Sequence, residues 1–125
     1  MEFEKRLALT YILDDQQITI TVCRATAKAG IQRYLLASKG NAENEKEPTD
    51  EATKILRLIL YPDLVSATTA IEGLPWPMEF NQFEELPEDL VNQWGDAVYK
   101  LNPHWRPTIV EGADDDQKKR RSKSE

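Results

Sequence analysis

Cysteine and histidine, on which many catalytic and metal sites depend, are almost absent from this sequence. Cys23 is the only cysteine and His104 the only histidine among 125 residues. One cysteine cannot form an intrachain disulfide or a zinc site made of cysteine ligands, and such low use of cysteine is typical of cytosolic proteins. Cys23 ends a predicted strand, so we interpret it as a small buried hydrophobe and not as a nucleophile.

The residue groupings that support catalysis are also scarce. A hydrolytic triad needs a histidine beside a nucleophile. His104 instead follows Pro103 at a predicted helix end, and we interpret it as a structural or surface imidazole. The five glycines are scattered and form no phosphate-binding loop. Neighbouring carboxylates, which are typical of turns and helix starts, occur at Asp14-Asp15, Glu84-Glu85 and Glu88-Asp89. We therefore predict no catalytic residue, no metal ligand, no cofactor and no enzymatic activity.

Long apolar runs and an excess of positive charge are missing as well. The longest apolar-rich stretch, residues 55–60, is too short to cross a bilayer, and the first residues lack the pattern of a signal peptide. The 22 acidic residues outnumber the 16 basic ones, which gives a formal net charge of −6 at pH 7. Such a balance disfavours binding to nucleic acid and to anionic membranes. We therefore expect a cytoplasmic protein whose partners are other proteins, with no nucleic acid and no membrane among them.

Periodic apolar patterns are what the sequence does contain. Apolar and β-branched residues alternate with others over residues 7–11 and 18–22, and residues 14–16 between them suit a turn. These segments predict an N-terminal β-hairpin. The clearest helix runs from Pro87 to Pro103, because its apolar residues follow the helical period. They are Leu90, Val91, Trp94, Ala97, Val98 and Leu101.

Three further helices are predicted between these two elements. Thr26 suits the cap of a helix that ends shortly before Gly40, which serves as a stop signal. A polar loop is expected over residues 39–49, and a second helix then runs up to Pro62, which should end it. A third, short helix is expected over residues 63–71.

These patterns predict an α+β fold, a mainly helical small domain with an N-terminal β-hairpin and about four helices. One domain is expected over residues 1–105, with the polar loop at residues 39–49. Residues 106–125 are expected to form a flexible charged tail, because apolar content fades there and three aspartates precede five basic residues.

Aromatic residues provide the candidates for a protein interface. The four candidates are Trp76, Phe80, Trp94 and Trp105. Tryptophan is enriched among the residues that dominate binding energy at interfaces. Trp94 falls on the apolar stripe of the last predicted helix, so core packing explains it most simply. Trp76 and Trp105 flank prolines at the edges of helices, and the sequence leaves open whether they cover the core or anchor a partner.

Several segments together resemble the short form of the tail assembly chaperones of siphophages and related prophages. The C-terminal part of the resemblance comprises Phe83 to Val91, Trp94, and Ala97 to Trp105. The remaining part comprises Ile18 to Val22, Arg24 to Thr26, Tyr61 to Val65, and Trp76-Pro77. Its most specific features are the helix start at Leu86-Pro87 and the ending at residues 102–105. The polar segment 39–47 departs from the family pattern.

The resemblance implies a non-enzymatic protein that keeps the tape measure protein soluble and helps tail-tube subunits to assemble around it in the host cytoplasm. The implied partners are therefore the tape measure protein and the tail-tube protein. The sequence leaves open whether the protein also associates with itself. Two other functions also fit the sequence: a structural component of the tail or of the head–tail connector, and an acidic inhibitor that mimics DNA. The inhibitor ranks lower because the acidic residues cluster at helix starts and in loops.

Overall fold

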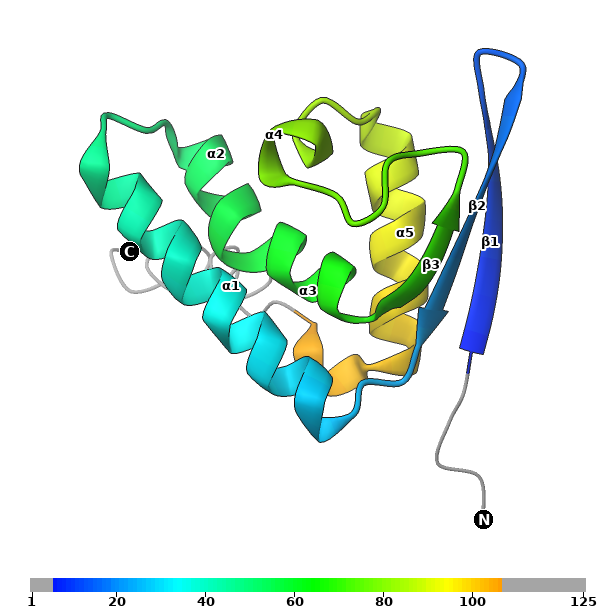
Figure 1. Ribbon diagram of the computed structural model, residues 1–125, viewed down its shortest axis with the longest axis horizontal. Helices are drawn as coiled ribbons and strands as arrows, with labels where there is room; N and C mark the ends of the chain where they lie inside the picture. Colours follow the sequence, from blue (N-terminus) through cyan, green and yellow to red (C-terminus); the bar gives the residue numbers. More distant parts are fainter. Residues whose placement is uncertain (1–5, 107–125) are drawn as a thin grey trace, which may run out of the picture.

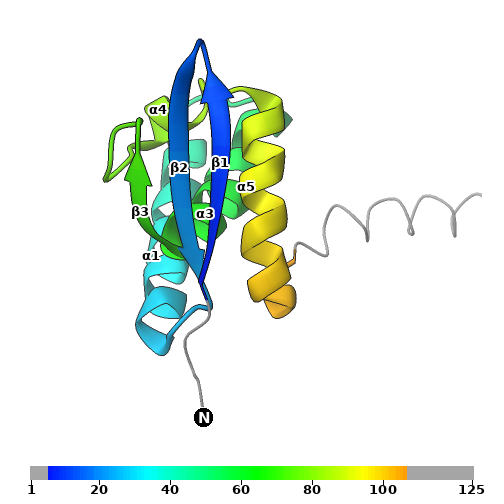
Figure 2. The same ribbon diagram turned by 90° about the vertical axis from the view of Figure 1, so that its right-hand side faces the viewer.

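The predicted N-terminal β-hairpin is present, and a third strand is added to it. The computed structural model describes residues 6–106. Strands β1 (Arg6–Leu13), β2 (Gln16–Cys23) and β3 (Thr68–Glu72) form an antiparallel sheet in the order β1-β2-β3. Within the described part of the chain, the helices all lie on one side of this sheet (Figures 1 and 2).

A two-residue turn joins β1 to β2. Asp14 and Asp15 both have positive φ, at 51° and 67°, and Leu13 pairs with Gln16 across the turn. Positive φ at both central residues gives a turn whose twist matches that of the flanking strands, and aspartate tolerates this conformation better than most residues with a side chain. The predicted turn is confirmed, although Gln16 already belongs to β2.

Strand β3 corrects one prediction made from the sequence. The pattern predicts a helix over residues 63–71, but the helix ends at Ser66 and Thr68–Glu72 pairs with β2. This segment contains three β-branched residues, which favour a strand once a neighbouring strand supplies hydrogen bonds. That neighbour lies almost 50 positions earlier in the chain, so a local pattern does not reveal the pairing.

Helix α1 (Ala27–Lys46) is longer than the sequence predicts. Thr26 caps it as expected, because its side-chain oxygen accepts a hydrogen bond of 3.2 Å from the Ala29 N–H. The predicted stop at Gly40 and the predicted polar loop over residues 39–49 are wrong. The helix continues to its last lysine, and only a short connection leads to the next helix.

The next helix passes through Pro62 without a break, although the sequence predicts a stop there. It consists of α2 (Glu51–Ile55), a π-helical turn η1 (Leu56–Leu60) and α3 (Tyr61–Ser66). The Tyr61 N–H bonds to the carbonyl of Leu56, five residues back. We attribute the continuity to this wider turn, because it relieves the collision that a proline ring makes in a regular α-helix.

The predicted last helix is confirmed at both ends. Helix α5 (Glu88–Leu101) follows Pro87 and ends just before the 3-10 turn η2 (Pro103–Trp105), and the short α4 (Phe80–Phe83) precedes it. The core lies between α5, α3 and the sheet. Its fully buried apolar side chains include Ile18, Ile20, Val22, Leu64, Phe83, Leu90, Trp94 and Val98.

The fold class is therefore the predicted one. The described residues contain the hairpin and four helices, if α2, η1 and α3 are taken as one continuous helix. No helix within residues 6–106 is both long and apolar enough to cross a membrane. The predicted flexible tail, residues 106–125, lies outside the described residues except for Arg106.

Candidate protein-binding surface

Large apolar side chains are exposed mainly on helix α1. Among the described residues, Ile31, Tyr34 and Leu35 are 62%, 69% and 59% exposed, and Ile12 on β1 is 61% exposed. The three residues of α1 are spaced by three and four positions, so they lie on one side of the helix. We call Ile31, Tyr34 and Leu35 the α1 apolar face. Its burial would need a partner, because no described element covers it.

Small residues on the opposite side of α1 explain why this face points outward. Ala29 and Gly40 are the buried residues of α1. At Gly40 the helix crosses η1 so closely that a Cβ would lie 2.6 Å from the carbonyl oxygen of Arg57. The close approach places the small residues of α1 inward, and the helical period then places Ile31, Tyr34 and Leu35 outward.

A hollow between α1 and η1 extends the α1 apolar face. It has a volume of about 240 Å³, and Tyr34 forms part of its wall. The other apolar residues that line it are Ala37, Leu58 and Ile59. Leu58 and Ile59 are only half-buried. A side chain from a partner that contacts Tyr34 could therefore also enter this hollow.

A hydrogen-bonded network underlies the hollow and holds three helices together. Asp63 is 1% exposed. One of its carboxylate oxygens accepts a 2.5 Å hydrogen bond from Arg33 Nε, and the other accepts a 2.7 Å bond from the Tyr99 hydroxyl. Burial raises the pKa of Asp63 above its ordinary value, although the hydrogen bonds from Arg33 and Tyr99 act in the opposite direction. Burial and the nearby Asp63 charge also raise the pKa of Tyr99.

A larger apolar groove lies on the other side of η1, toward α4 and α5. Its volume is about 500 Å³. The apolar residues that line it are Ala52, Ile55, Leu56, Leu60, Phe83, Leu86 and Val91. Glu84 and Glu88 also line it, both exposed. The groove therefore combines an apolar floor with acidic residues, which suits a segment with apolar and basic side chains.

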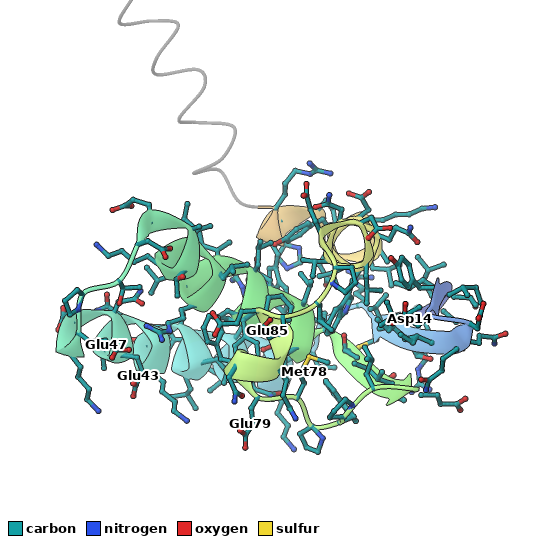
Figure 3. All side chains as sticks on the ribbon, turned by 90° about the horizontal axis from the view of Figure 1, so that it is seen from above. Asp14, Glu43, Glu47, Met78, Glu79 and Glu85 are labelled. Atoms are coloured by element: carbon teal, nitrogen blue, oxygen red, sulfur yellow. The ribbon has the colours of Figure 1, made fainter. Side chains whose placement is uncertain are left out.

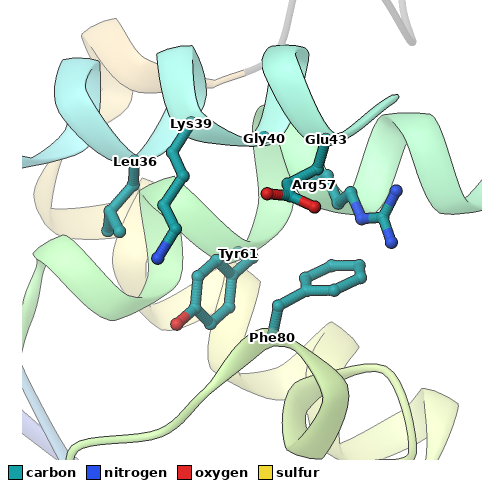
Figure 4. A pocket seen from close by; sticks show the side chains of 7 residues that line it. All are labelled: Leu36, Lys39, Gly40, Glu43, Arg57, Tyr61 and Phe80. Atoms are coloured by element: carbon teal, nitrogen blue, oxygen red, sulfur yellow. The ribbon is translucent and has the colours of Figure 1, made fainter. Parts of the chain in front are cut away.

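A third hollow, of about 230 Å³, contains Phe80, one of the predicted interface residues. The Phe80 ring packs edge-on against Tyr61, with ring centres 5.5 Å apart, and the Arg57 guanidinium lies 5.0 Å from the Phe80 ring centre. Figure 4 shows the side chains of Lys39 and Glu43 pointing from α1 toward the rings of Tyr61 and Phe80. Phe80 is half-buried, so one side of its ring remains accessible from this hollow.

The structure separates the four predicted interface residues into two groups. Trp94 is fully buried, and its indole N–H donates a 2.8 Å hydrogen bond to Thr68 Oγ1. Trp105 is 5% exposed, and the Arg33 guanidinium lies 4.7 Å from its ring centre. Both tryptophans are part of the core, as the sequence favours for Trp94 and leaves open for Trp105, so neither is presented to a partner. Trp76 and Phe80 are half-buried, and they stay candidates.

The residues of the α1 apolar face were missed as interface candidates. Their helical spacing is visible in the sequence, but periodicity alone does not tell whether a stripe faces the core or the solvent.

Groups of side chains that could hold a metal ion do not occur among residues 6–106. His104 is exposed in η2, and its ring lies next to Trp105 at a centre-to-centre distance of 6.0 Å. The comparisons made with protein-family models, curated proteins and solved structures gave no match for this chain.

Proposed function

We propose that this protein binds other proteins without catalysing a reaction, and that it acts as a tail assembly chaperone for a tape measure protein in the host cytoplasm. The observation that carries the proposal is the exposure of Ile31, Tyr34 and Leu35 on one side of α1. Three large apolar side chains at helical spacing form the kind of surface that a monomer leaves uncovered when it has a partner.

Apolar surface on both sides of η1 fits an elongated helical partner. The hollow beside Tyr34 and the larger groove toward α5 both contain half-buried aliphatic residues of the same turn. An amphipathic helix binds such surfaces by placing side chains from one of its sides into successive hollows. A tape measure protein, which is long and helical, would offer many such segments, and several copies of a weak binder would then cover it with high avidity.

Negative charge around the groove supports the same proposal. Figure 3 shows Glu43 and Glu47 near the end of α1 and Glu79 and Glu85 on either side of α4. Glu43 and Glu47 are ion-paired with Lys46 and Arg57. The acidic residues that favour a partner with basic flanks are therefore Glu84 and Glu88 in the groove. The formal charge of −6 would also keep a complex with an apolar partner soluble.

The proposal is tested by co-expression with the tape measure protein of the same genome, followed by pull-down and a measurement of soluble tape measure protein. Ile31→Ser and Leu35→Ser should each weaken binding by about tenfold or more, the effect of removing a central apolar contact. Ile12→Ser is the matched control, because Ile12 is equally exposed but lies on β1. Insoluble tape measure protein with no complex, or equal binding by all three variants, would contradict the proposal.

Analysis of purified phage particles by mass spectrometry separates the chaperone from a structural component. A chaperone should be absent from the finished particle, whereas a tail or connector component should be present at a fixed copy number. The acidic-inhibitor alternative predicts that the protein inhibits a nuclease and so protects DNA from cleavage, and the chaperone proposal predicts no protection.

A further inference from the structure

The uncharged surface of α1 continues past the α1 apolar face toward the end of the helix. Ser38 and Ala42 follow Leu35 at spacings of three and four positions, and both are exposed. Figure 1 shows α1 along the outer edge of the molecule, where no described element covers this side of the helix. Large side chains therefore occupy the first half of the exposed side of α1, and small ones occupy its second half.

The charged residues at the two ends of this surface have opposite signs. Lys28 lies three positions before Ile31, and Glu45 lies three positions after Ala42. Both are exposed, and neither makes an ion pair within the described part of the chain. They are 17 positions apart, or about 26 Å along the helix, so they cannot pair with each other. A partner that neutralises both must present an acidic and a basic group at the same separation.

A second copy of α1 that runs in the opposite direction has this arrangement of charge. Antiparallel packing about a two-fold axis brings the Lys28 end of each copy to the Glu45 end of the other. It also opposes the two helix dipoles, which is favourable. Parallel packing would instead place Lys28 near Lys28 and Glu45 near Glu45, which costs free energy. The charges of α1 therefore favour one direction of self-packing.

The sizes of the side chains between these charges fit the same arrangement. The register that sets Lys28 opposite Glu45 also sets Ile31 opposite Ala42 and Leu35 opposite Ser38. Each large side chain then meets a small one, so the two helices can approach closely along their length. Charge and size therefore select the same register, although they are independent properties of the helix.

We propose that two copies of this chain associate through antiparallel packing of their α1 helices. The contact uses the same surface on both copies, so it closes at a dimer. It does not depend on the proposed function, but it covers the same α1 apolar face. The dimer is therefore the form of the free protein, and a helix of the tape measure protein would displace the second copy.

Sedimentation equilibrium of the full chain alone provides the first test. Only one helix from each copy forms the contact, so we expect a Kd in the micromolar range. The average mass should rise with concentration from the 14.4 kDa of one chain to twice that value. A mass of one chain at all concentrations up to the solubility limit would overturn the proposal.

A pair of serine variants locates the contact. Leu35→Ser should weaken association by about tenfold or more, because it removes a large apolar side chain next to the two-fold axis. Ile12→Ser should leave association unchanged, since Ile12 is equally exposed but lies on β1. Association of Leu35→Ser that equals that of the parent protein would show that α1 is not the interface.

Exchange of the charges tests the antiparallel direction. Lys28→Glu alone and Glu45→Lys alone each place like charges opposite one another twice in the dimer, so each should associate about tenfold more weakly than the parent protein. An equimolar mixture of the two variants should form a heterodimer about as tightly as the parent, because both contacts again join opposite charges. Lys100→Glu makes the same charge change on the exposed side of α5 and should have no effect. A mixture that associates no better than its components would overturn the antiparallel arrangement.

The dimer and the proposed function fail in distinguishable ways. A protein that dimerises but leaves the tape measure protein insoluble contradicts the proposed function alone. A monomer that still binds the tape measure protein contradicts the dimer alone. When both hold, addition of tape measure protein should lower the fraction of dimer, because the two compete for α1. A fraction of dimer that stays constant would overturn the sharing of this face.

Discussion

The hydroxyl of Tyr99 donates a 2.7 Å hydrogen bond to Asp63, a residue 36 positions earlier in the chain. The same carboxylate accepts from Arg33, so one buried side chain connects α1, α3 and α5. Arg33 and Asp63 also line the hollow beside the α1 apolar face. The polar network therefore fixes the position of the helix that carries Ile31, Tyr34 and Leu35.

Tyr99→Phe should destabilise the protein at neutral pH and should do so less at alkaline pH. At pH 7 the variant leaves Asp63 with one donor fewer, at a cost of about 1–2 kcal/mol in the free energy of unfolding. In the parent protein, burial raises the pKa of Tyr99. As the pH rises through about 10, Tyr99 therefore ionises in the unfolded chain while it stays protonated in the folded one, and stability is lost. Phenylalanine cannot ionise, so the variant lacks this loss.

Urea unfolding at pH 8, 9.5 and 10.5 checks this prediction. The difference in unfolding free energy between the parent protein and Tyr99→Phe should shrink as the pH rises. The other tyrosines are common to both proteins and cancel in the comparison. A difference that stays constant or grows with pH would show that the pKa of Tyr99 is not raised by folding.

The two glycines of α1 should respond in opposite ways to alanine. A Cβ at Gly40 would lie 2.6 Å from the Arg57 carbonyl oxygen, so Gly40→Ala must push α1 away from η1. We expect a loss of about 2 kcal/mol. No atom lies within 4 Å of a Cβ at Gly30, so Gly30→Ala should gain up to about 1 kcal/mol from helix propensity alone. Chemical denaturation of the two variants measures both changes in unfolding free energy. Two changes of the same sign would contradict the close crossing of α1 and η1.

Asn102 should be among the most sensitive polar positions. It is fully buried, and its side chain accepts from the Ala25 N–H at 2.7 Å and donates to the carbonyls of Cys23 and Val98. Asn102→Ala leaves these backbone groups without their partner, and we expect a loss of about 3 kcal/mol. Asn92→Ala on the exposed side of α5 is the matched control and should change stability by less than about 0.5 kcal/mol. Similar thermal shifts for the two variants would disprove the structural role of Asn102.

Two substitutions in the hairpin turn should stabilise the protein. Asp14 and Asp15 both hold positive φ, a conformation that asparagine and glycine adopt more readily than aspartate. The double substitution of Asp14→Asn and Asp15→Gly should therefore raise the free energy of unfolding by about 1 kcal/mol. Exchanging the order, with Asp14→Gly and Asp15→Asn, provides a control of the same composition. A loss of stability in the first variant would mean that the turn has another geometry.

Local patterns predict those elements whose stabilising contacts are close in sequence. Helix α5 and the β1–β2 hairpin follow from apolar periods and from nearby turn or cap residues, and both are confirmed. The prediction fails at Gly40 and Pro62, where a stop signal is overridden by the crossing of α1 with η1 and by the π-helical turn. Strand β3 was missed because its partner is distant in the chain.

The candidate surface was harder to predict than the fold. Trp94 and Trp105 are of the residue type that is enriched at protein interfaces, yet both are buried. Ile31, Tyr34 and Leu35 form an apolar stripe like that of α5, and only the packing of α1 through its small residues shows that this stripe faces outward.

The π-helical turn has a consequence for how the two apolar surfaces influence each other. Leu56 and Leu60 face the groove toward α5, while Leu58 and Ile59 face the hollow beside Tyr34. One turn of backbone thus forms a common wall, and a segment seated on either side restrains the same five residues. Occupation of the first side should therefore lower the entropic cost of filling the second, so that two short helical segments would bind cooperatively without touching each other.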